Sequence, residues 1–106
     1  MSQEQSRAQQ LVGEIAPKLA ELTDDVLFGD VWARPGLSPR DRSLITVAAL
    51  TALGRTDQLR SHLRLALDNG VTQSELSELA THLAFYAGWP AGMSAATTLK
   101  QVLDDR

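Results

Sequence analysis

The sequence predicts an all-α fold, a compact bundle of about five or six helices forming a single domain over residues 1–106. Apolar residues recur at helical spacing along most of the chain, and glycine, proline and capping residues punctuate that pattern. No segment shows the alternation of apolar and polar residues expected of a strand. Because 106 residues with 43% apolar content lie near the small end for a self-sufficient core, we also expect a homo-oligomer.

The first helix is expected over about residues 4–22. Its apolar stripe consists of Leu11, Ile15 and Leu19. Pro17 lies inside this pattern and should kink or split the helix, because its ring removes a hydrogen bond and clashes with the preceding turn. A short helical piece is expected next, from residue 23 or 24 to residue 28.

The second long helix is expected over about residues 39–53. Ser38 is a capping residue, Pro39 occupies the first helical position and Asp41 places an acid in the first turn. Gly54 then ends the helix.

Two further helices should follow over about residues 57–69 and 73–87. The first has one apolar side, formed by Leu59, Leu63, Ala66 and Leu67. It ends at Asn69-Gly70, a favourable left-handed exit. The second begins with a capping box formed by Thr72 and Glu75.

A last helix is expected from Pro90 through Leu103, after the break at Gly88-Trp89-Pro90. No low-complexity segment or long linker interrupts the chain. These features predict one continuous helical domain.

Charge is distributed unevenly along the chain. The whole sequence carries a net charge of −3 and has a pI near 5.2, yet residues 34–64 contain six arginines against two aspartates. Guanidinium groups bind carboxylates bidentately, so one arginine-rich segment in an acidic chain suits a small anion better than a polyanion. We therefore expect an anion pocket and no nucleic-acid partner.

Several function classes are excluded or disfavoured by composition. The chain has no cysteine, which excludes disulfides, thiolate metal sites and thiol redox chemistry. Two histidines without metal-ligand spacing make a metal site unexpected. No apolar run approaches the ~20 residues of a membrane span, and the polar N-terminus lacks the apolar segment of a signal peptide. No membrane partner and a cytoplasmic location are expected.

His62 is the first candidate for acid–base chemistry. It follows Leu59 by three residues and precedes Ala66 by four, so it should point inward from its helix. Either it is a core histidine satisfied by a hydrogen bond, or it exchanges protons near neutral pH. Neighbouring arginines should favour its neutral form.

A second candidate group lies on the next helix. Glu78, His82 and Tyr86 are spaced four residues apart, so one helical edge presents a carboxylate, an imidazole and a phenol. This edge is either a proton relay or an exposed polar surface.

Arg34 and Arg42 are the candidates for binding an anion. Arg34 stands in a rigid Trp-x-Arg-Pro turn, and Arg42 lies in the first turn of a helix whose dipole also favours an anion. Surface ion pairs are the alternative for both arginines. Trp32 and Trp89 flank the Pro/Gly breaks, where aromatic side chains form either pocket walls or a subunit contact.

The chain resembles the carboxymuconolactone decarboxylase family over about residues 28–99. The matching segments are Gly29-Asp30-Val31-Trp32-Ala33-Arg34-Pro35-Gly36-Leu37, Arg42-Ser43-Leu44-Ile45-Thr46, Leu59-x-x-His62-x-x-x-Ala66-x-x-x-Gly70-x-Thr72-x-x-Glu75 and Ala84-Phe85-Tyr86-Ala87-Gly88-Trp89-Pro90. The resemblance implies an AhpD-like helical fold and a homo-oligomer, a trimer or a hexamer, with active sites near subunit contacts.

The same resemblance implies an enzyme that uses no cofactor. The family's namesake removes carbon dioxide from 4-carboxymuconolactone, giving 3-oxoadipate enol-lactone in the degradation of aromatic compounds. A peroxide-reducing branch, which resembles the alkylhydroperoxidase AhpD, carries a Cys-x-x-Cys pair and a glutamate. Here those positions hold Arg55, Gln58 and Ser43, so a thiol peroxidase is excluded.

We therefore predict a decarboxylase of a small carboxylated lactone. His62 is the first choice for the proton donor, and His82 steered by Glu78 is the second. The substrate-binding residues are expected to be Arg34, Arg42, Trp32, Trp89 and Tyr86. A cofactor-free isomerase or cyclase acting on a related anionic metabolite is one alternative, and a non-catalytic helical oligomer that binds a metabolite is the other.

Overall fold

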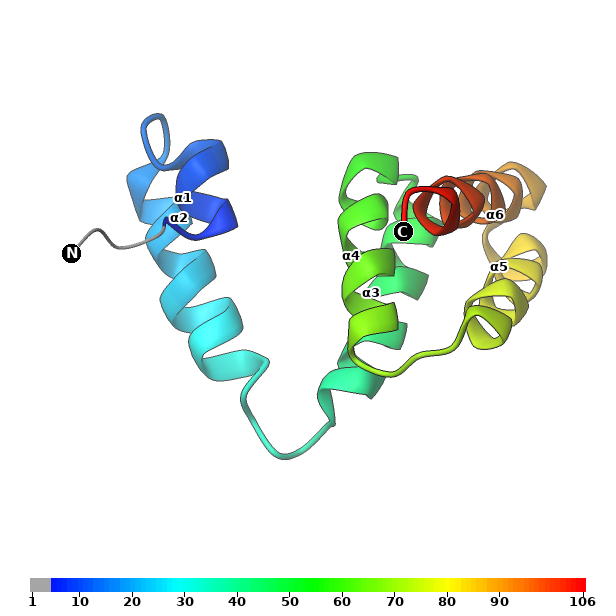
Figure 1. Ribbon diagram of the computed structural model, residues 1–106, viewed down its shortest axis with the longest axis horizontal. Helices are drawn as coiled ribbons and strands as arrows, with labels where there is room; N and C mark the ends of the chain where they lie inside the picture. Colours follow the sequence, from blue (N-terminus) through cyan, green and yellow to red (C-terminus); the bar gives the residue numbers. More distant parts are fainter. Residues whose placement is uncertain (1–4) are drawn as a thin grey trace. The chain divides into compact units, whose positions relative to one another are not determined.

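A computed structural model describes residues 5–106, and Figure 1 shows its path. The predicted all-α class is confirmed, because the described residues form six α-helices, one π-helical segment and no strand. The chain divides into two compact units, Met1–Ser38 and Pro39–Arg106. The predicted helix start at residue 4 lies outside the described residues.

The N-terminal unit contains two short α-helices, α1 (Arg7–Val12) and α2 (Pro17–Leu22). Pro17 is the first residue of α2, so the predicted split of the first helix is confirmed. Ser6 caps α1, where its hydroxyl accepts a hydrogen bond from the Gln9 amide at 3.0 Å. The same hydroxyl donates to Asp24 Oδ2 at 2.8 Å, which ties the start of this unit to its later part.

The segment predicted as a short helix is a π-helix, η1 (Thr23–Val31), which continues directly from α2. The amide of Trp32 extends the pattern by donating to the Leu27 carbonyl at 2.9 Å, five residues back. Gly29 permits this winding, since a Cβ there would lie 2.8 Å from the Asp24 carbonyl oxygen. Apolar spacing does not distinguish α from π winding over so few residues.

Most apolar side chains of the N-terminal unit are exposed. Among its described residues only Ala20 is buried. The large apolar side chains that remain exposed are Leu11, Ile15, Leu19, Leu22, Val26, Leu27, Phe28, Val31 and Leu37. The helices of this unit therefore depend on capping and local hydrogen bonds more than on a closed core.

The second unit is a four-helix assembly. Its helices are α3 (Pro39–Leu53), α4 (Thr56–Asp68), α5 (Gln73–Ala87) and α6 (Trp89–Asp104). Gly54, Gly70 and Gly88 separate them, with φ values of 71°, 97° and 105°, a left-handed region that glycine adopts at little cost. The predicted bounds are reproduced to within one residue.

The core of the second unit lies between these four helices. Its buried apolar residues are Val47, Leu59, Leu63, Ala66, Val71, Leu76, Ala80, Ala95, Leu99 and Val102. A buried polar contact joins α3 to the end of α4, because Asn69 Nδ2 donates to Ser43 Oγ at 2.9 Å. This contact fixes the register of α3 relative to α4.

Two local features hold α5 in place. Its capping box is formed as predicted, with Thr72 and Glu75 each accepting from the other's backbone amide. Arg40 of α3 also donates to the Glu75 carboxylate. These contacts lower the pKa of Glu75: the backbone hydrogen bond from Thr72 is the largest cause, followed by the bond from Arg40.

Within the described part of the chain, no helix combines the length and apolar character needed to cross a lipid bilayer.

Candidate active site

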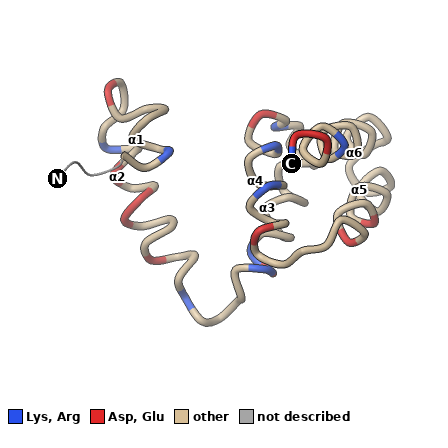
Figure 2. The backbone as a smooth tube through the Cα atoms, viewed as in Figure 1, with Lys and Arg blue, Asp and Glu red and all other residues tan. Residues whose placement is uncertain are grey.

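Half of the arginines in the arginine-rich segment contact acidic or amide side chains of the second unit. Figure 2 marks in blue the Lys and Arg positions along the backbone of α3 and α4, and in red the acidic positions near the C-terminus. Arg40 pairs with Glu75 and Asp41. Arg60 lies 2.8 Å from Gln101 Oε1 and 3.9 Å from Asp57, and Arg64 lies 3.9 Å from Asp105. Three of the six arginines therefore contact acids or an amide of the second unit, and Arg42 remains the arginine of this unit that the sequence predicts to bind an anion.

His62 lies on the side of α4 away from α6. The contacts of Arg60 and Arg64 with Gln101 and Asp105 place α6 along the edge of α4 that carries those arginines. His62 is two residues from each of them, so it cannot share their edge. It is half-buried beside the apolar stripe, as its spacing predicted.

Arg42 lies in the first turns of α3, the helix next to α4. Its neighbour Ser43 is completely buried against α4 through Asn69, and Arg42 itself is half-buried. One turn later, the Thr46 hydroxyl donates to the Arg42 carbonyl at 2.7 Å. The second unit therefore presents a guanidinium and an imidazole from two adjacent helices.

The register of α3 and α4 sets the spacing between these two groups. Ser43 is opposite Asn69, and His62 precedes Asn69 by seven residues, which is about two helical turns or roughly 10 Å along the axis. A guanidinium binds anions and an imidazole transfers protons, so both groups are candidates for contacts with one small ligand.

Burial lowers the pKa of His62, because desolvation penalises the charged imidazolium. The free protein therefore holds a mostly neutral His62 at neutral pH. An anion bound nearby would counter this effect and favour the protonated ring.

The second predicted group forms an exposed edge of α5. Glu78, His82 and Tyr86 are all exposed, and the rings of His82 and Tyr86 stack with centroids 4.8 Å apart and planes inclined by 30°. The contact described for His82 is thus the phenol ring, rather than the Glu78 carboxylate. The role of this edge as a proton relay stays a prediction.

The predicted aromatic walls lie in different units. Trp32 is half-buried and contacts Phe28 at a centroid distance of 5.6 Å, whereas Trp89 meets Phe85 edge to face at 5.7 Å. Trp32 and Arg34 belong to the N-terminal unit. That they share one cavity with Arg42 and His62 stays a prediction.

A groove between α5 and α6 was not predicted from the sequence. It encloses about 570 Å³ and, of the predicted site residues, includes only Trp89. Its walls include four small residues, namely Ala80, Ala84, Gly92 and Ala96. The four-residue spacing within each pair of these small residues is the signal that sequence reasoning missed, because small residues at that interval let helices approach closely.

Comparison with known proteins identifies relatives of this chain. Residues 17–101 match the model of the carboxymuconolactone decarboxylase family. A 4-carboxymuconolactone decarboxylase from Acinetobacter baylyi is 51% identical over 78 residues, which cover 74% of this chain and 58% of that protein. A nitrosuccinic acid decarboxylase from Metarhizium robertsii is 35% identical over 85 residues, covering 80% and 59%.

A third relative, an uncharacterised 15.0 kDa protein from Paracoccus denitrificans, is 32% identical over 80 residues. The match covers 74% of this chain and 60% of that protein, so the chain spans about three fifths of the length of the curated relatives. The family model matches residues of both structural units. By that match, which extends over most of its length, the chain belongs to the carboxymuconolactone decarboxylase family.

Proposed function

We propose that this protein is a cofactor-independent decarboxylase of a small carboxylated lactone of the 4-carboxymuconolactone type. Two relatives bear the names of decarboxylases, and the more similar of these two is named for this substrate. The structural observation that supports the proposal is that half-buried Arg42 and half-buried His62 belong to the adjacent helices α3 and α4, whose register separates the two positions by about two helical turns. That spacing fits a substrate bearing a carboxylate at some distance from the carbon that is protonated.

In the proposed reaction, the carbon–carbon bond to one carboxylate breaks and carbon dioxide leaves. The electron pair moves into the unsaturated lactone, and a proton is then added to carbon. Arg42, together with Arg34, binds the carboxylate that stays. The departing carboxylate lies against Trp32 or Trp89, since tight pairing with arginine would stabilise the ground state more than the transition state.

His62 supplies the proton in this scheme, with His82 as the second choice. Its burial makes the imidazolium a stronger acid than an exposed histidine, and the anionic substrate raises the fraction protonated once it binds. A general acid contributes about 10²- to 10⁴-fold to the rate. This range sets the scale of the test.

The test measures carbon dioxide release from 4-carboxymuconolactone by the wild type and by His62→Ala, His82→Ala and Thr97→Ala. Thr97 is exposed on α6 and bonds to its own helix, so it is the matched control. We expect His62→Ala to lower turnover by about 10²- to 10⁴-fold and the control to retain it. A larger loss in His82→Ala would transfer the role to His82, and full activity in both histidine variants would refute acid catalysis by either.

The pH dependence gives an independent readout. If protonated His62 is the acid, kcat/KM should fall as pH rises through a pKa below 6.5, because burial lowers that pKa in the free enzyme. The corresponding pKa in kcat should be higher, since bound anion favours the imidazolium. If the pH profile of kcat gives a lower pKa than the pH profile of kcat/KM, this assignment is contradicted.

Product analysis separates the alternatives. An isomerase or cyclase would change the substrate without releasing carbon dioxide, and a metabolite-binding oligomer would show saturable binding with no product. The trimeric or hexameric assembly and the cytoplasmic location expected from the sequence stay predictions.

A further inference from the structure

Arg42 is bracketed by two contacts that come from one short stretch of the chain. Arg40, two residues before it, donates to the Glu75 carboxylate, and Ser43, the residue after it, accepts from Asn69 Nδ2 at 2.9 Å. Asn69 ends α4 and Glu75 lies in the first turn of α5, so both contacts come from the connection between these helices (Figure 1). This connection therefore holds the turn of α3 that carries Arg42 on both sides.

The connection itself has a defined backbone. At the end of α4, the Val71 amide donates to the Ala66 carbonyl at 2.9 Å, five residues back, and Gly70 has a φ of 97°. Val71 is buried, so packing as well as hydrogen bonding fixes the exit of the chain from α4. The capping box of Thr72 and Glu75 then starts α5. The side chains at the two ends of the connection are thus presented to α3 from fixed positions.

The contact with Ser43 lies in the interior. Ser43 is completely buried, and the Nε atom of the preceding residue, Arg42, is buried as well. A buried hydroxyl that loses its partner is costly, so the structure favours arrangements in which the Asn69 contact is formed. Because the base of the guanidinium lies inside the protein, a displacement of the Ser43 turn would move the whole Arg42 side chain.

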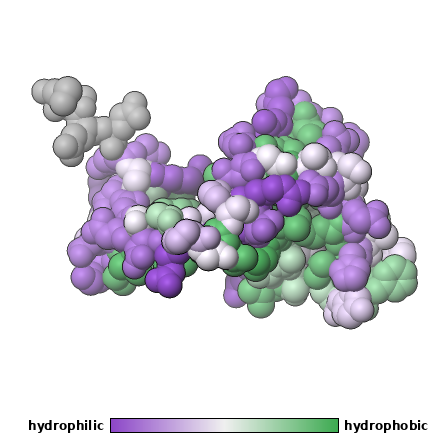
Figure 3. All heavy atoms as spheres, turned by 90° about the horizontal axis from the view of Figure 1, so that it is seen from below, coloured by the Kyte–Doolittle hydropathy of each residue, from purple (hydrophilic) through white to green (hydrophobic). Residues whose placement is uncertain are grey.

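The contact with Glu75 lies at the surface, where hydrophilic and hydrophobic side chains are mixed (Figure 3). The Arg40 and Glu75 side chains are 36% and 40% exposed, and an exposed ion pair contributes little to stability. The carboxylate is nevertheless oriented in advance, because Oε1 accepts from the Thr72 amide at 2.9 Å and Oε2 accepts from Arg40. This pair is therefore better suited to fixing a direction than to stabilising the fold.

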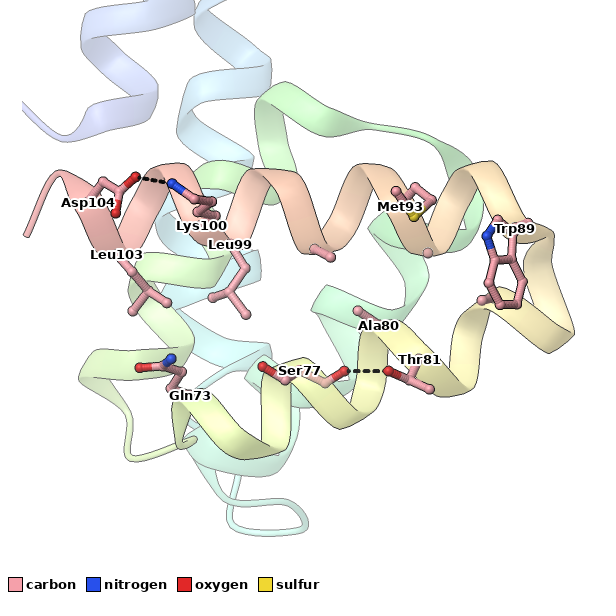
Figure 4. A pocket seen from close by; sticks show the side chains of 13 residues that line it. Gln73, Ser77, Ala80, Thr81, Trp89, Met93, Leu99, Lys100, Leu103 and Asp104 are labelled. Atoms are coloured by element: carbon pink, nitrogen blue, oxygen red, sulfur yellow. Dashed lines mark hydrogen bonds and ion pairs between the residues drawn. The ribbon is translucent and has the colours of Figure 1, made fainter.

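The opposite side of α5 has different surroundings. Gln73 and Ser77 line the groove between α5 and α6 (Figure 4). Glu75 is two residues from each of them, so it leaves the helix on the other side, toward α3. Ser77 therefore provides a control position on the same helix.

We propose that Asn69 is a positioning residue for Arg42. Its hydrogen bond to Ser43 joins the helix that carries His62 to the turn that carries Arg42, and the ion pair of Glu75 restrains the same turn from the surface. The inference rests on the proposed function, in which Arg42 binds the carboxylate that stays on the substrate. Asn69 touches no substrate in this scheme and acts through the placement of the guanidinium.

The first test is a double-mutant cycle on carbon dioxide release from 4-carboxymuconolactone, with Asn69→Ala, Arg42→Ala and the double variant. Asn69 has a φ of −86°, so alanine fits its backbone. We expect Asn69→Ala to raise KM by about 5- to 10-fold with little change in kcat, because the carboxylate bound by Arg42 is present throughout the reaction. In the Arg42→Ala background the same substitution should have almost no further effect. Equal losses in both backgrounds would show a merely structural role and overturn the proposal.

Further variants separate positioning from general destabilisation. Ser43→Ala deletes the other partner of the bond with the loss of one oxygen atom, and it should reproduce the rise in KM. Gln101→Ala is the matched control, because it removes a side-chain amide that joins α6 to Arg60 of α4 at 2.8 Å. It should retain the wild-type KM, and an equal rise in this variant would overturn the proposal.

The surface restraint has its own pair of variants. Glu75→Gln weakens the contact with Arg40 and should raise KM less than Asn69→Ala does, since the Asn69 contact is the more buried of the two. Ser77→Ala, on the groove side of α5, should leave KM unchanged.

The second test observes Arg42 without any reaction. The Nε–H group of Arg42 gives an NMR signal whose exchange with water is slow while Nε is buried. We expect Asn69→Ala and Ser43→Ala to speed this exchange several-fold and Gln101→Ala to leave it unchanged. Unchanged exchange in both of the first two variants would overturn the proposal. If the wild type releases no carbon dioxide but the exchange responds as expected, the proposed function fails and the positioning of Arg42 by Asn69 stands.

Discussion

The two sides of the second unit differ in what they place at the surface. Helices α3 and α4 carry half-buried Arg42 and His62, a guanidinium that can bind an anion and an imidazole that can transfer a proton. The α5–α6 side carries small residues, exposed Trp89 and an ion pair that is already complete. We propose catalysis for residues of α3 and α4, whereas the α5–α6 side presents exposed apolar side chains.

The strongest way to break this division is to remove one arginine from α3 and another from the edge of α4 that contacts α6. Arg42→Ala should lower kcat/KM by about 10- to 100-fold, because a hydrogen bond to a charged group contributes about 1.5–3 kcal/mol. Arg60→Ala removes the contact with Gln101 on the α6 side and should leave kcat/KM near the wild-type value. Steady-state kinetics on folded protein would check both variants, and equal losses would mean that the two sides are not functionally distinct.

Gly92→Ala tests the α5–α6 side. The added Cβ would lie 2.7 Å from the Ala84 Cβ and 2.9 Å from the Ala80 carbonyl oxygen, so α6 must move away from α5. Overpacking of this kind costs about 1–3 kcal/mol, which exceeds the helix-propensity gain of about 1 kcal/mol at the upper end of that range. Denaturant unfolding should show a net loss relative to Ser94→Ala, an exposed control on the same helix.

The smallest expected effect concerns the capping box at the start of α5, whose Glu75 also accepts a hydrogen bond from Arg40 of α3. Thr72→Ala removes the side-chain acceptor for the Glu75 amide and should lower the free energy of unfolding by about 1 kcal/mol. Thr97→Ala, whose hydroxyl bonds only within α6, is the control. If the two threonine variants unfold at the same denaturant concentration, the cap does not contribute to stability.

Much of the second unit was predictable because its signals are local. Ser38-Pro39, the Thr72 capping box and the glycines after each helix act within a few residues, so they define helix ends without tertiary information. The apolar stripe of α4 likewise indicated which side of that helix is buried. The observed helix ends match the predicted ones because these local signals are not overridden by contacts between residues far apart in the sequence.

The site was less predictable because its electrostatics are tertiary. The sequence shows six arginines close together but not that Glu75, Gln101 and Asp105 pair with three of them. These partners lie 35 to 41 residues from the arginines they contact, beyond any local pattern. The inward placement of His62 was predictable, whereas the exposed stacking of His82 on Tyr86 required the structure.

The π winding of η1 has a consequence for the direction of two residues that we propose to bind substrate, Trp32 and Arg34. Each additional residue in a helical turn changes the direction in which the following side chains leave the helix. The nine-residue π-helix η1 therefore sets the direction of the Trp32 and Arg34 side chains that follow it. This winding depends on Gly29, since a larger residue there would collide with the Asp24 carbonyl oxygen. A family member with the same tryptophan and arginine but a one-residue deletion in this segment would point both side chains elsewhere, and its substrate range would shift with no change in the chemical groups it offers.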